Sequence, residues 1–524
     1  MRLHFLISRY LFLFLLFCWG FIQAQQPAPA SNFTTYQPPV FKDDSRVEKI
    51  KSLLPAIEKM YKEYATKKNF PGMAFGIVVD DQLLYTGNSG FTNIAQKTPV
   101  SSKSLFRIAS MSKSFTALAI LKLRDEGKLS LDEPIYNYLP AFKNVALLTK
   151  DAAPITIRNL VTHTAGFPED NPWGDRQLDI TDVVFMEMIN KGISFSNVPG
   201  VSYEYSNLGF ALLGEIIARV SGKPYQQYIT ENILKPLGMD HTIWEYTAAP
   251  PQLLAHGYRW NDNAWKEEAL LHDGVYGAMG GLLTSIEDFS KYMSFQMSAW
   301  PARNDEDTGP VKRSSVREMQ QPWAFSNLDA AFQYPDGRKC AMVSSYGYGL
   351  RIGQDCNGRK YAGHTGGLPG FGSQWWILPE YGIGVVVFGN LTYARMGDIN
   401  WAVMDTLVNT ANLQPRQLPV SKILQQRKEQ LMKLLPDWKY ADESEIFAVN
   451  FFPDHSLESR KKQSQDIFGR AGKIKHVGEL VPENQLRGSF KVECEKATIE
   501  IYFTLTPENP ALVQYLDMQE VKSR

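Results

Sequence analysis

The chain has 524 residues, 44% of them hydrophobic and 12% aromatic, and its 55 basic residues balance 55 acidic ones. That length exceeds an average single domain and is enough to bury a sizeable core. Because the charge is balanced and no block of like charge stands out, the composition argues against nucleic acid or an anionic membrane surface as a partner.

The N-terminus has the pattern of a targeting segment. Arg2 and Arg9 precede an apolar run over 10–17, and Ala24 offers a small residue for cleavage. We therefore expect a signal peptide over 1–24 and an exported protein, periplasmic or extracellular. A membrane anchor is the alternative, but the run is short for a spanning helix and polar, proline-rich sequence follows it at once. We expect no stable membrane span after cleavage.

The next elements are a leader, a helix, a hairpin and a second helix. Residues 25–45 are rich in proline and predict a flexible leader, and a helical pattern follows from about residue 47 to 67. Apolar runs at 73–79 and 83–85 flank a short turn and predict a β-hairpin. A long apolar helix is expected from Ser110 to about Asp125.

A large helical segment then interrupts the strands. Residues 129–279 are mostly helical in pattern, strand signals return near 346, at 372–378 and at 382–388, and a helix is expected over 399–412. Strands, a helical insertion and strands again predict an α+β sandwich whose sheet is completed by pieces distant in sequence.

The C-terminal part is expected to be separate. Residues 414–420 predict a linker, and the remainder, 421–524, predicts a small accessory α+β domain that begins with a helix over 421–435. Strands are expected near three segments, at 475–480, 487–494 and 498–505.

Three short motifs carry chemistry: Ser110-x-x-Lys113, then Tyr205-x-Asn207, then His364-Thr365-Gly366. Each is weak alone, and a second Ser-x-x-Lys pair occurs in the polar stretch 459–462. The prediction depends on the order of the three motifs along the chain and on the elements in which they are expected to lie. Together they predict a serine acyl-enzyme hydrolase that uses lysine and tyrosine, rather than a Ser-His-Asp triad, to move protons.

Ser110 lies where a helix is expected to begin, so its hydroxyl is accessible and the helix dipole favours developing negative charge. Lys113, one turn later, projects to the same side and inward. Burial lowers the pKa of a lysine toward the range useful for proton transfer. The alternative is that Ser110 is a simple N-cap and Lys113 a solvated charge.

Tyr205 and Asn207 lie in a polar loop that opens an apolar helix. A phenol beside a lysine ammonium can ionise more easily and serve as a proton shuttle to Ser110. The amide of Asn207 is suited to orienting a substrate carbonyl or the lysine. The alternative is that Asn207 is a helix N-cap and Tyr205 a packing aromatic.

The third motif, continued by Gly367, lies where a strand is expected to run beside the site. Its glycines, Gly366 and Gly367, let the backbone approach a substrate closely, either to pair with an extended ligand or to donate an amide to the oxyanion. His364 offers a positive or dipolar group to a substrate carboxylate. The alternative is a glycine-rich strand end with a surface histidine.

Three cysteines remain after the expected cleavage: Cys340, Cys356 and Cys494. The first two bracket a strand-rich segment, so a bridge between them in an oxidising periplasm and a pair of unbonded cysteines are both compatible with the sequence. Neither Cys-x-x-Cys nor His-x-x-x-His occurs, so we expect no zinc site and no cofactor.

With these motifs the chain resembles the serine β-lactamase/penicillin-binding family, in the branch of class C β-lactamases, serine DD-carboxypeptidases, D-aminopeptidases and related esterases. Supporting segments are residues 106–109 before the serine, the loop 160–166 and the Gly-Gly-Leu segment 280–285. The resemblance covers roughly residues 45–412. It implies a β-lactamase-like hydrolase domain over 46–413, built on an antiparallel sheet flanked by helices.

The resemblance also implies roles for the motif residues. Ser110 would be the acylated nucleophile, Lys113 and Tyr205 the proton-transfer pair, and Asn207 a group that orients the substrate. The backbone amides of Ser110 and Gly367 would form the oxyanion hole.

The third motif departs from the class C pattern, which carries lysine at the position of His364. Histidine there is familiar among peptidases and esterases, so we expect an enzyme that cleaves an amide, peptide or ester in a small molecule or peptide. His364 and Thr365 would line that substrate, and His163 in the loop motif would be structural. The alternative function is a penicillin-binding or ligand-sensing module with little turnover. The sequence leaves the oligomeric state open.

Overall fold

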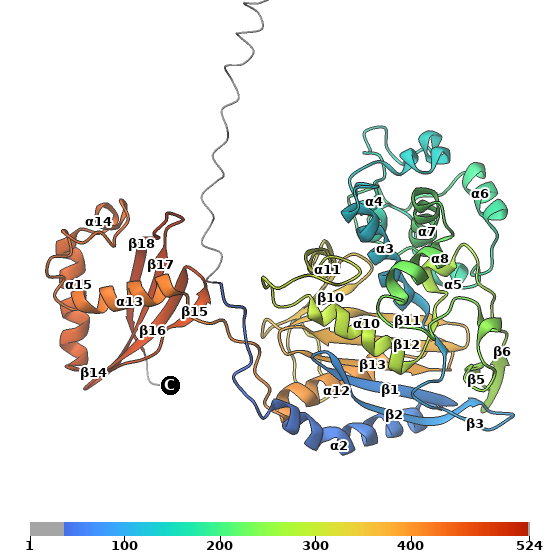
Figure 1. Cartoon of the computed structure of the whole chain (residues 1–524), viewed down its shortest axis with the longest axis horizontal. Coiled ribbons are helices and arrows are strands. Elements are labelled where there is room, and N and C mark those ends of the chain that lie inside the picture. Colours follow the sequence, from blue (N-terminus) through green and yellow to red (C-terminus); the bar gives the residue numbers. More distant parts are fainter. Residues whose placement is uncertain (1–35, 522–524) are drawn as a thin grey trace, which may run out of the picture. The chain divides into compact units, whose positions relative to one another are not determined.

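The computed structural model describes residues 36–521, so the predicted signal peptide (1–24) and the leader as far as residue 35 lie outside the described residues. The chain divides into two compact units (Figure 1). The larger unit is Val40–Gln417, and the smaller one contains the chain from Leu418 onward. This division falls within the segment 414–420, where the sequence predicts a linker.

The first unit is built on a nine-stranded antiparallel sheet in the order β3-β2-β1-β13-β12-β11-β10-β9-β8. β1 pairs with β13, so strands from the two ends of the unit are neighbours within the sheet, as the sequence predicts. The strands are β1 (Gly72–Val79), β2 (Gln82–Asn93), β3 (Thr98–Pro99), β8 (Ala324–Asp329), β9 (Met342–Tyr346), β10 (Arg351–Asp355), β11 (Lys360–Leu368), β12 (Phe371–Leu378) and β13 (Ile383–Gly389).

Both faces of this sheet are covered by helices. α2 (Arg46–Lys67) and α12 (Gly397–Thr410) lie on one face, while α3 (Lys113–Asp125) and α10 (Ile286–Ser298) lie on the other (Figure 1). β1 is therefore apolar on both sides. Its alternate side chains enter the two cores, which explains its unbroken hydrophobic run.

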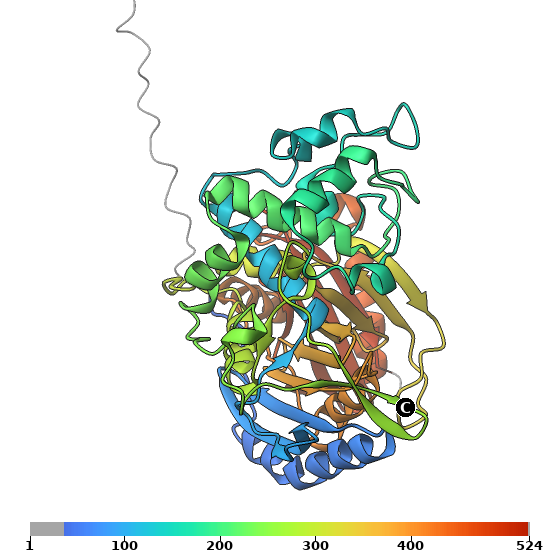
Figure 2. The ribbon, with the colours of Figure 1, turned by 90° about the vertical axis from the view of Figure 1, so that its right-hand side faces the viewer.

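The insertion between the strands is mostly helical and lies beside α3 (Figure 2). Its helices are α4 (Ile157–Val161), α5 (Asn171–Gly174), α6 (Asp182–Lys191), α7 (Asn207–Ser221), α8 (Tyr225–Ile229) and α9 (Gly277–Gly280), and α11 (Arg313–Met319) follows α10. Two small strand pairs of this unit are not predicted from the sequence. They are β5 (Gly257–Asn261) with β6 (Ala264–Glu268), and β4 (Phe106–Arg107) with β7 (Leu283–Thr284).

The second unit has its own sheet, in the order β14-β16-β17-β18 with β15 beside β16. A separate apolar core joins this sheet to its helices. The elements are α13 (Lys422–Leu434), α14 (Phe451–Asp454), α15 (Leu457–Ala471), β14 (Ile474–Val477), β15 (Val481–Asn484), β16 (Arg487–Cys494), β17 (Thr498–Leu505) and β18 (Val513–Glu520). β18 was not anticipated from the sequence.

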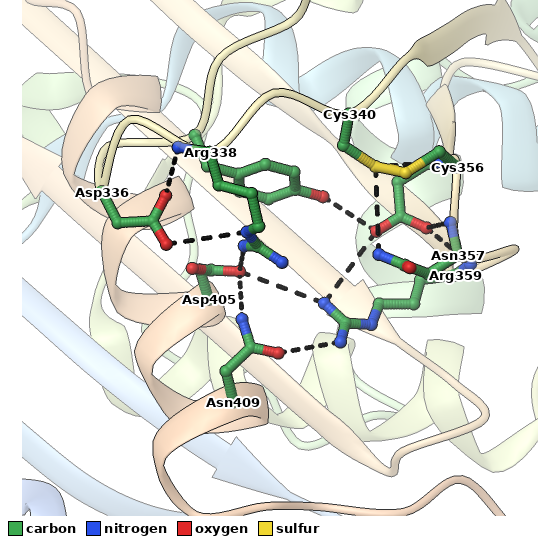
Figure 3. Close-up of a disulfide and its surroundings, with 10 residues drawn as sticks. Asp336, Arg338, Cys340, Cys356, Asn357, Arg359, Asp405 and Asn409 are labelled. Carbon is green, nitrogen blue, oxygen red and sulfur yellow. Dashed lines mark hydrogen bonds and ion pairs between the residues drawn. A yellow bond between two sulfur atoms is a disulfide. The ribbon is translucent and has the colours of Figure 1, made fainter. Parts of the chain in front are cut away.

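Cys340 and Cys356 form a disulfide, so the alternative of two unbonded cysteines is wrong (Figure 3). The bond joins the segment just before β9 to the turn after β10, next to Met342 and Asp355, which are paired in the sheet. Cys494, in the second unit, is free and buried.

Two features are absent from residues 36–521. None of the helices there has the length and hydropathy needed to cross a membrane. No group of three or more His, Cys, Asp or Glu side chains lies close enough together to hold a metal ion.

Candidate active site

Ser110 lies on a short 3₁₀ turn, Ala109–Ser112, between β4 and α3. The helix itself begins at Lys113 rather than at Ser110, and neither turn nor helix has a side-chain cap. The alternative that Ser110 is an N-cap is therefore wrong. Ala109, directly before it, has φ of +50°, a conformation that costs energy for a residue with a Cβ. The surrounding packing holds Ser110 in a strained turn, with 8% of the residue exposed.

Lys113 is completely buried, and its ammonium contacts only neutral oxygens. Nζ donates to Ser110 Oγ at 3.0 Å, to Asn207 Oδ1 at 2.7 Å and to the Met279 carbonyl at 3.0 Å. Burial lowers the pKa of Lys113 to about 7, and the charges of Asp175 and Asp170 only partly oppose this effect. The alternative of a solvated lysine is wrong.

Asn207 holds Lys113 while another residue caps its helix. Asp170 accepts from the backbone N–H groups of Asn207 and Leu208, at 2.6 and 3.0 Å, and so satisfies the start of α7. The Asn207 side chain is free for the site, with its amide nitrogen donating to Asn171 Oδ1 at 3.1 Å. Of the two roles predicted for the Asn207 amide, orienting a substrate carbonyl or orienting the lysine, its hydrogen bond to Lys113 fits the second.

Tyr205 lies against both Ser110 and Lys113. Its hydroxyl is hydrogen-bonded to Ser110, and Lys113 Nζ is 4.8 Å from the centre of its ring. Burial raises the pKa of Tyr205 above its ordinary value, more than the cation of Arg351 and the Ser110 hydrogen bond lower it. The expectation that a neighbouring ammonium would make this phenol ionise more easily is wrong, because the site is too dry for a phenolate. Tyr205 keeps its proton.

His364 is completely buried and uncharged. Its Nδ1 lies 2.6 Å from the Thr365 carbonyl and therefore carries the proton, so Nε2 accepts from the Tyr346 hydroxyl at 2.8 Å. Burial, with Arg351 and Lys113 nearby, lowers the pKa of His364 well below its ordinary value. His364 is therefore a neutral, dipolar group rather than a positive one, and the alternative of a surface histidine is wrong.

The two glycines of the third motif have different neighbours. A Cβ on Gly366 would lie 2.2 Å from the Ile108 carbonyl, so this glycine lets β11 touch the segment that carries the nucleophile rather than a substrate. Ser373 on β12 donates to the same carbonyl at 2.8 Å. Thr365 and Gly367 are half-buried on β11, and a Cβ on Gly367 would lie 3.2 Å from the ring of Tyr393.

His163 supports Tyr205 from behind. It has φ of +58°, its Nδ1 accepts from the Ser206 backbone at 3.1 Å, and its ring centre is 4.2 Å from that of Tyr205. Burial lowers its pKa well below the ordinary value. These contacts fit the structural role that the resemblance implies for it.

Sequence reasoning missed three residues around the site: Arg351, Asp175 and Tyr393. Arg351, the first residue of β10, interacts with Tyr203, Tyr205 and Tyr346, and within residues 36–521 no carboxylate forms an ion pair with it. Asp175 and Tyr393 come from two loops and are hydrogen-bonded to each other. No local motif marks these residues, since only the folded chain brings them together.

Comparison with known proteins identifies the family of this chain. The β-lactamase family model matches residues 57–408, which include all three motifs. Protein flp of Staphylococcus aureus (strain N315) is 29% identical over 384 residues, 71% of this chain and 70% of that protein. Beta-lactamase-like protein 2 of Dictyostelium discoideum is 30% identical over 267 residues, 48% of each chain.

Two solved structures share the fold. The octameric penicillin-binding protein homologue from Pyrococcus abyssi has a TM-score of 0.57 at 22% identity, over 90% of this chain and 96% of that one. A penicillin-binding protein from Bacillus halodurans has a TM-score of 0.53 at 24% identity, over 68% and 98%. Since the family model spans well over half of the sequence, the chain belongs to the β-lactamase family.

Proposed function

We propose that the protein is an exported serine hydrolase that cleaves an amide, peptide or ester bond through an acyl-enzyme on Ser110. One observation carries this proposal. A buried lysine, Lys113, donates to the Ser110 hydroxyl at 3.0 Å and has a pKa lowered to about 7 by burial. An amine in that state is uncharged in a substantial fraction of molecules at neutral pH and can take a proton from serine.

In the proposed acylation, uncharged Lys113 accepts the Ser110 proton while Oγ bonds to the substrate carbonyl carbon. The backbone amides of Ser110 and Gly367 stabilise the oxyanion. Tyr205, which keeps its proton in the free enzyme, donates it to the leaving nitrogen or oxygen as that bond breaks. Lys113 then returns a proton to Tyr205, so that charge and protons balance.

Deacylation reverses these roles with water. Water bonds to the acyl carbon and gives up a proton to the Lys113–Tyr205 pair. The bond between that carbon and Ser110 Oγ breaks, and Ser110 regains its proton. The free acid leaves. A site that acylates but performs this half-reaction slowly would instead capture ligands, which is the alternative function, a penicillin-binding or sensing module.

The shape of β11 supports an extended substrate. β10 pairs with β11 only over residues 360–363, so within the described chain the same edge of 364–368 has no strand partner. Backbone groups along such an edge can pair with a substrate backbone. Arg351 begins β10 at this point, without a carboxylate partner, and is therefore suited to a substrate carboxylate. Because His364 is neutral, Arg351 is the residue at this edge that can supply a positive charge to a substrate carboxylate.

Export is proposed from the signal-peptide pattern of residues 1–24. The disulfide between Cys340 and Cys356 supports it, because such bonds persist in oxidising compartments. N-terminal sequencing of the protein recovered from outside the cytoplasm tests this point, with cleavage after Ala24 expected. Full-length protein retained in the cytoplasm would contradict it.

The catalytic proposal is tested by mass spectrometry after incubation with benzylpenicillin and, separately, by hydrolysis of a panel of simple esters and amides. Ser110→Ala is the control in both. Hydrolysis that requires Ser110 is expected for at least one ester or amide. A stable, stoichiometric penicillin adduct without turnover of any substrate would favour the sensing alternative. Hydrolysis that is unchanged in Ser110→Ala for every accepted substrate would overturn the proposal.

A further inference from the structure

A groove beside the active site has no role in the proposed reaction. It has a volume of about 450 Å³ and is lined mainly by two segments that are far apart in the sequence, residues 200–203 and 323–326. The first segment leads into the second motif, and the second contains the start of β8, the edge strand of the large sheet. Clefts of about 300–1,000 Å³ are typical of small-molecule sites, so the groove has room for a part of the substrate.

Tyr203 connects the groove to the catalytic residues. Its side chain lines the groove and is hydrogen-bonded to Arg351. The Arg351 guanidinium lies 5.4 Å from the centre of the Tyr205 ring, and the Tyr205 hydroxyl is hydrogen-bonded to Ser110. Ala324, from the other lining segment, packs in one apolar cluster with Tyr203 and Tyr205. Because Tyr205 protonates the leaving group in the proposed reaction, the groove lies on the leaving side of the scissile bond.

Three side chains of the groove expose apolar surface to water. Val201 is 72% exposed, Phe325 62% and Trp323 45%. Single exposed apolar side chains are common on proteins, but here three from two segments gather around one groove next to a reactive serine. Apolar surface gathered in this way marks a place where a ligand or a partner binds, because binding removes that surface from water.

The polar groups of the groove favour an apolar ligand over a charged or a heavily hydroxylated one. Of the described residues that line it, none has a charged side chain. The Thr164 hydroxyl is already hydrogen-bonded to Thr162 and Asn159. The Ser326 hydroxyl is likewise bonded to Tyr203. Since these hydroxyls have partners within the protein, a sugar would find few free groups to pair with.

We propose that this groove binds a large apolar or aromatic group carried by the leaving part of the substrate. Val201 and Phe325 contact that group, and Trp323, whose ring is stacked on Tyr348 at 5.2 Å, forms a flat wall beside it. A leaving part with only a small side chain, such as a methyl group, would leave these three apolar surfaces in water. The inference rests on the proposed function, because it concerns the leaving group of the same acylation.

The test compares phenyl acetate with 4-phenylphenyl acetate, which carries a second ring on the leaving phenol and the same acyl group. Hydrolysis by Ser110→Ala is subtracted from each rate. The leaving-group ratio is kcat/KM for the larger ester divided by kcat/KM for the smaller one. An effect of a variant on Lys113 or on folding cancels in this ratio, because it acts on both esters. A third ester, phenyl 3-phenylpropionate, places the extra ring on the acyl side and gives an acyl-group ratio against phenyl acetate.

We expect a leaving-group ratio of about 10 or more for the wild type. Phe325→Ser and Val201→Ser should each lower it by about 3- to 10-fold, because each side chain covers only part of the bound ring. Both residues are exposed, so both variants should fold, and the acyl-group ratio should stay unchanged. Leu328→Ser is the matched control and should change neither ratio, because Leu328 is 54% exposed on the same strand β8 but does not line the groove.

The two proposals fail differently. Hydrolysis that requires Ser110, with a wild-type leaving-group ratio near 1 or with no turnover of 4-phenylphenyl acetate, would overturn the role of the groove and leave the proposed function standing. A leaving-group ratio that is unchanged in both groove variants, or an acyl-group ratio that falls equally, would do the same. If one groove variant does not fold, the other decides. Absence of Ser110-dependent hydrolysis across these esters and the panel of simple esters and amides would overturn both proposals.

Discussion

The first unit contains two polar clusters, and the cations in them have different partners. One cluster pairs its cations with carboxylates, whereas the other surrounds its cation with neutral oxygens. Beside the disulfide, Arg338 pairs with Asp405 at 2.6 Å, and Arg359 lies 4.0 Å from Asp405 and 2.8 Å from Asn409 (Figure 3). In the active site, Lys113 is more deeply buried and touches only neutral oxygens.

The difference separates a structural cation from a reactive one. Burial opposes the charge of Arg338, but the hydrogen bond to Asp405 and the charges of Asp405 and Asp336 together outweigh burial and raise the pKa of Arg338. Lys113 has no such partner, so burial prevails and lowers its pKa. A cation paired with a carboxylate stabilises the fold as a permanent charge, whereas a buried cation among neutral acceptors can lose its proton.

Removing the reactive cation should have the largest effect. Lys113→Met replaces the amine with an apolar side chain of similar length, so the proton of Ser110 has no acceptor. We expect kcat/KM to fall by at least about 10³-fold, as for the loss of a general base that acts together with its nucleophile. Steady-state kinetics on an accepted ester measures this, with Ser110→Ala as the reference for complete loss. Activity within tenfold of wild type would show that Lys113 is not the base.

Tyr205→Phe should have the next largest effect. Phenylalanine keeps the ring beside Lys113 and His163 but removes the hydroxyl that contacts Ser110. Because the phenol donates the proton to the leaving group, we expect kcat to fall by about 10²-fold for a poor leaving group such as an amide. The loss should be smaller for a p-nitrophenyl ester, whose leaving group needs no proton. Equal losses for both substrates would argue against proton donation by Tyr205.

The pH profile should follow the uncharged form of Lys113. Its pKa is lowered to about 7, and the reactive form is the deprotonated one, so kcat/KM should rise about tenfold per pH unit below 7 and level off above it. The negative charge of Asp175 raises the pKa of Lys113, so Asp175→Asn should shift this midpoint to lower pH. A profile that is flat between pH 5 and 8 would contradict the assignment.

A substitution in the cluster beside the disulfide should have the smallest effect on activity and a measurable effect on stability. Asp405→Asn removes the charge that holds Arg338 and Arg359, and we expect it to lower the free energy of unfolding by about 1–2 kcal/mol. The side chain of Asp405 is 11% exposed, and it lies on α12, on the opposite face of the sheet from α3. Denaturant titration and kinetics should show kcat/KM within about threefold of wild type. A large loss of activity would mean that the two clusters are coupled.

The sequence predicts the site as far as short-range patterns reach. Ser110 and Lys113 share one turn of chain, and the order of the three motifs identifies the family, so their convergence is predictable. The protonation states of the site residues are not predictable in this way, because they depend on how completely residues from other segments bury each group. The neutral His364 and the protonated Tyr205 result from packing against Tyr346, His163 and Arg351, which come from other segments.

The same limit applies to the fold. The central strands are predictable because β1 is buried on both faces and forms one apolar run, whereas the short pairs β4–β7 and β5–β6 lack any such run. Asp175 and Tyr393 could not be identified from the sequence, because a loop acid and a loop tyrosine more than 200 residues apart have no local signal. Only their hydrogen bond beside Gly367 identifies them.

The most direct test of the central claim is the ionisation of Lys113 itself. Isotope-labelled lysine in the whole protein, with the Lys113 signal assigned by its loss in Lys113→Met, allows the side-chain amine to be titrated by NMR. The structure predicts an apparent pKa near 7, because the amine is buried among neutral oxygens. An apparent pKa close to 10.5, the ordinary value for lysine, would contradict the account, because Lys113 would then remain charged at neutral pH and be unable to take the proton of Ser110.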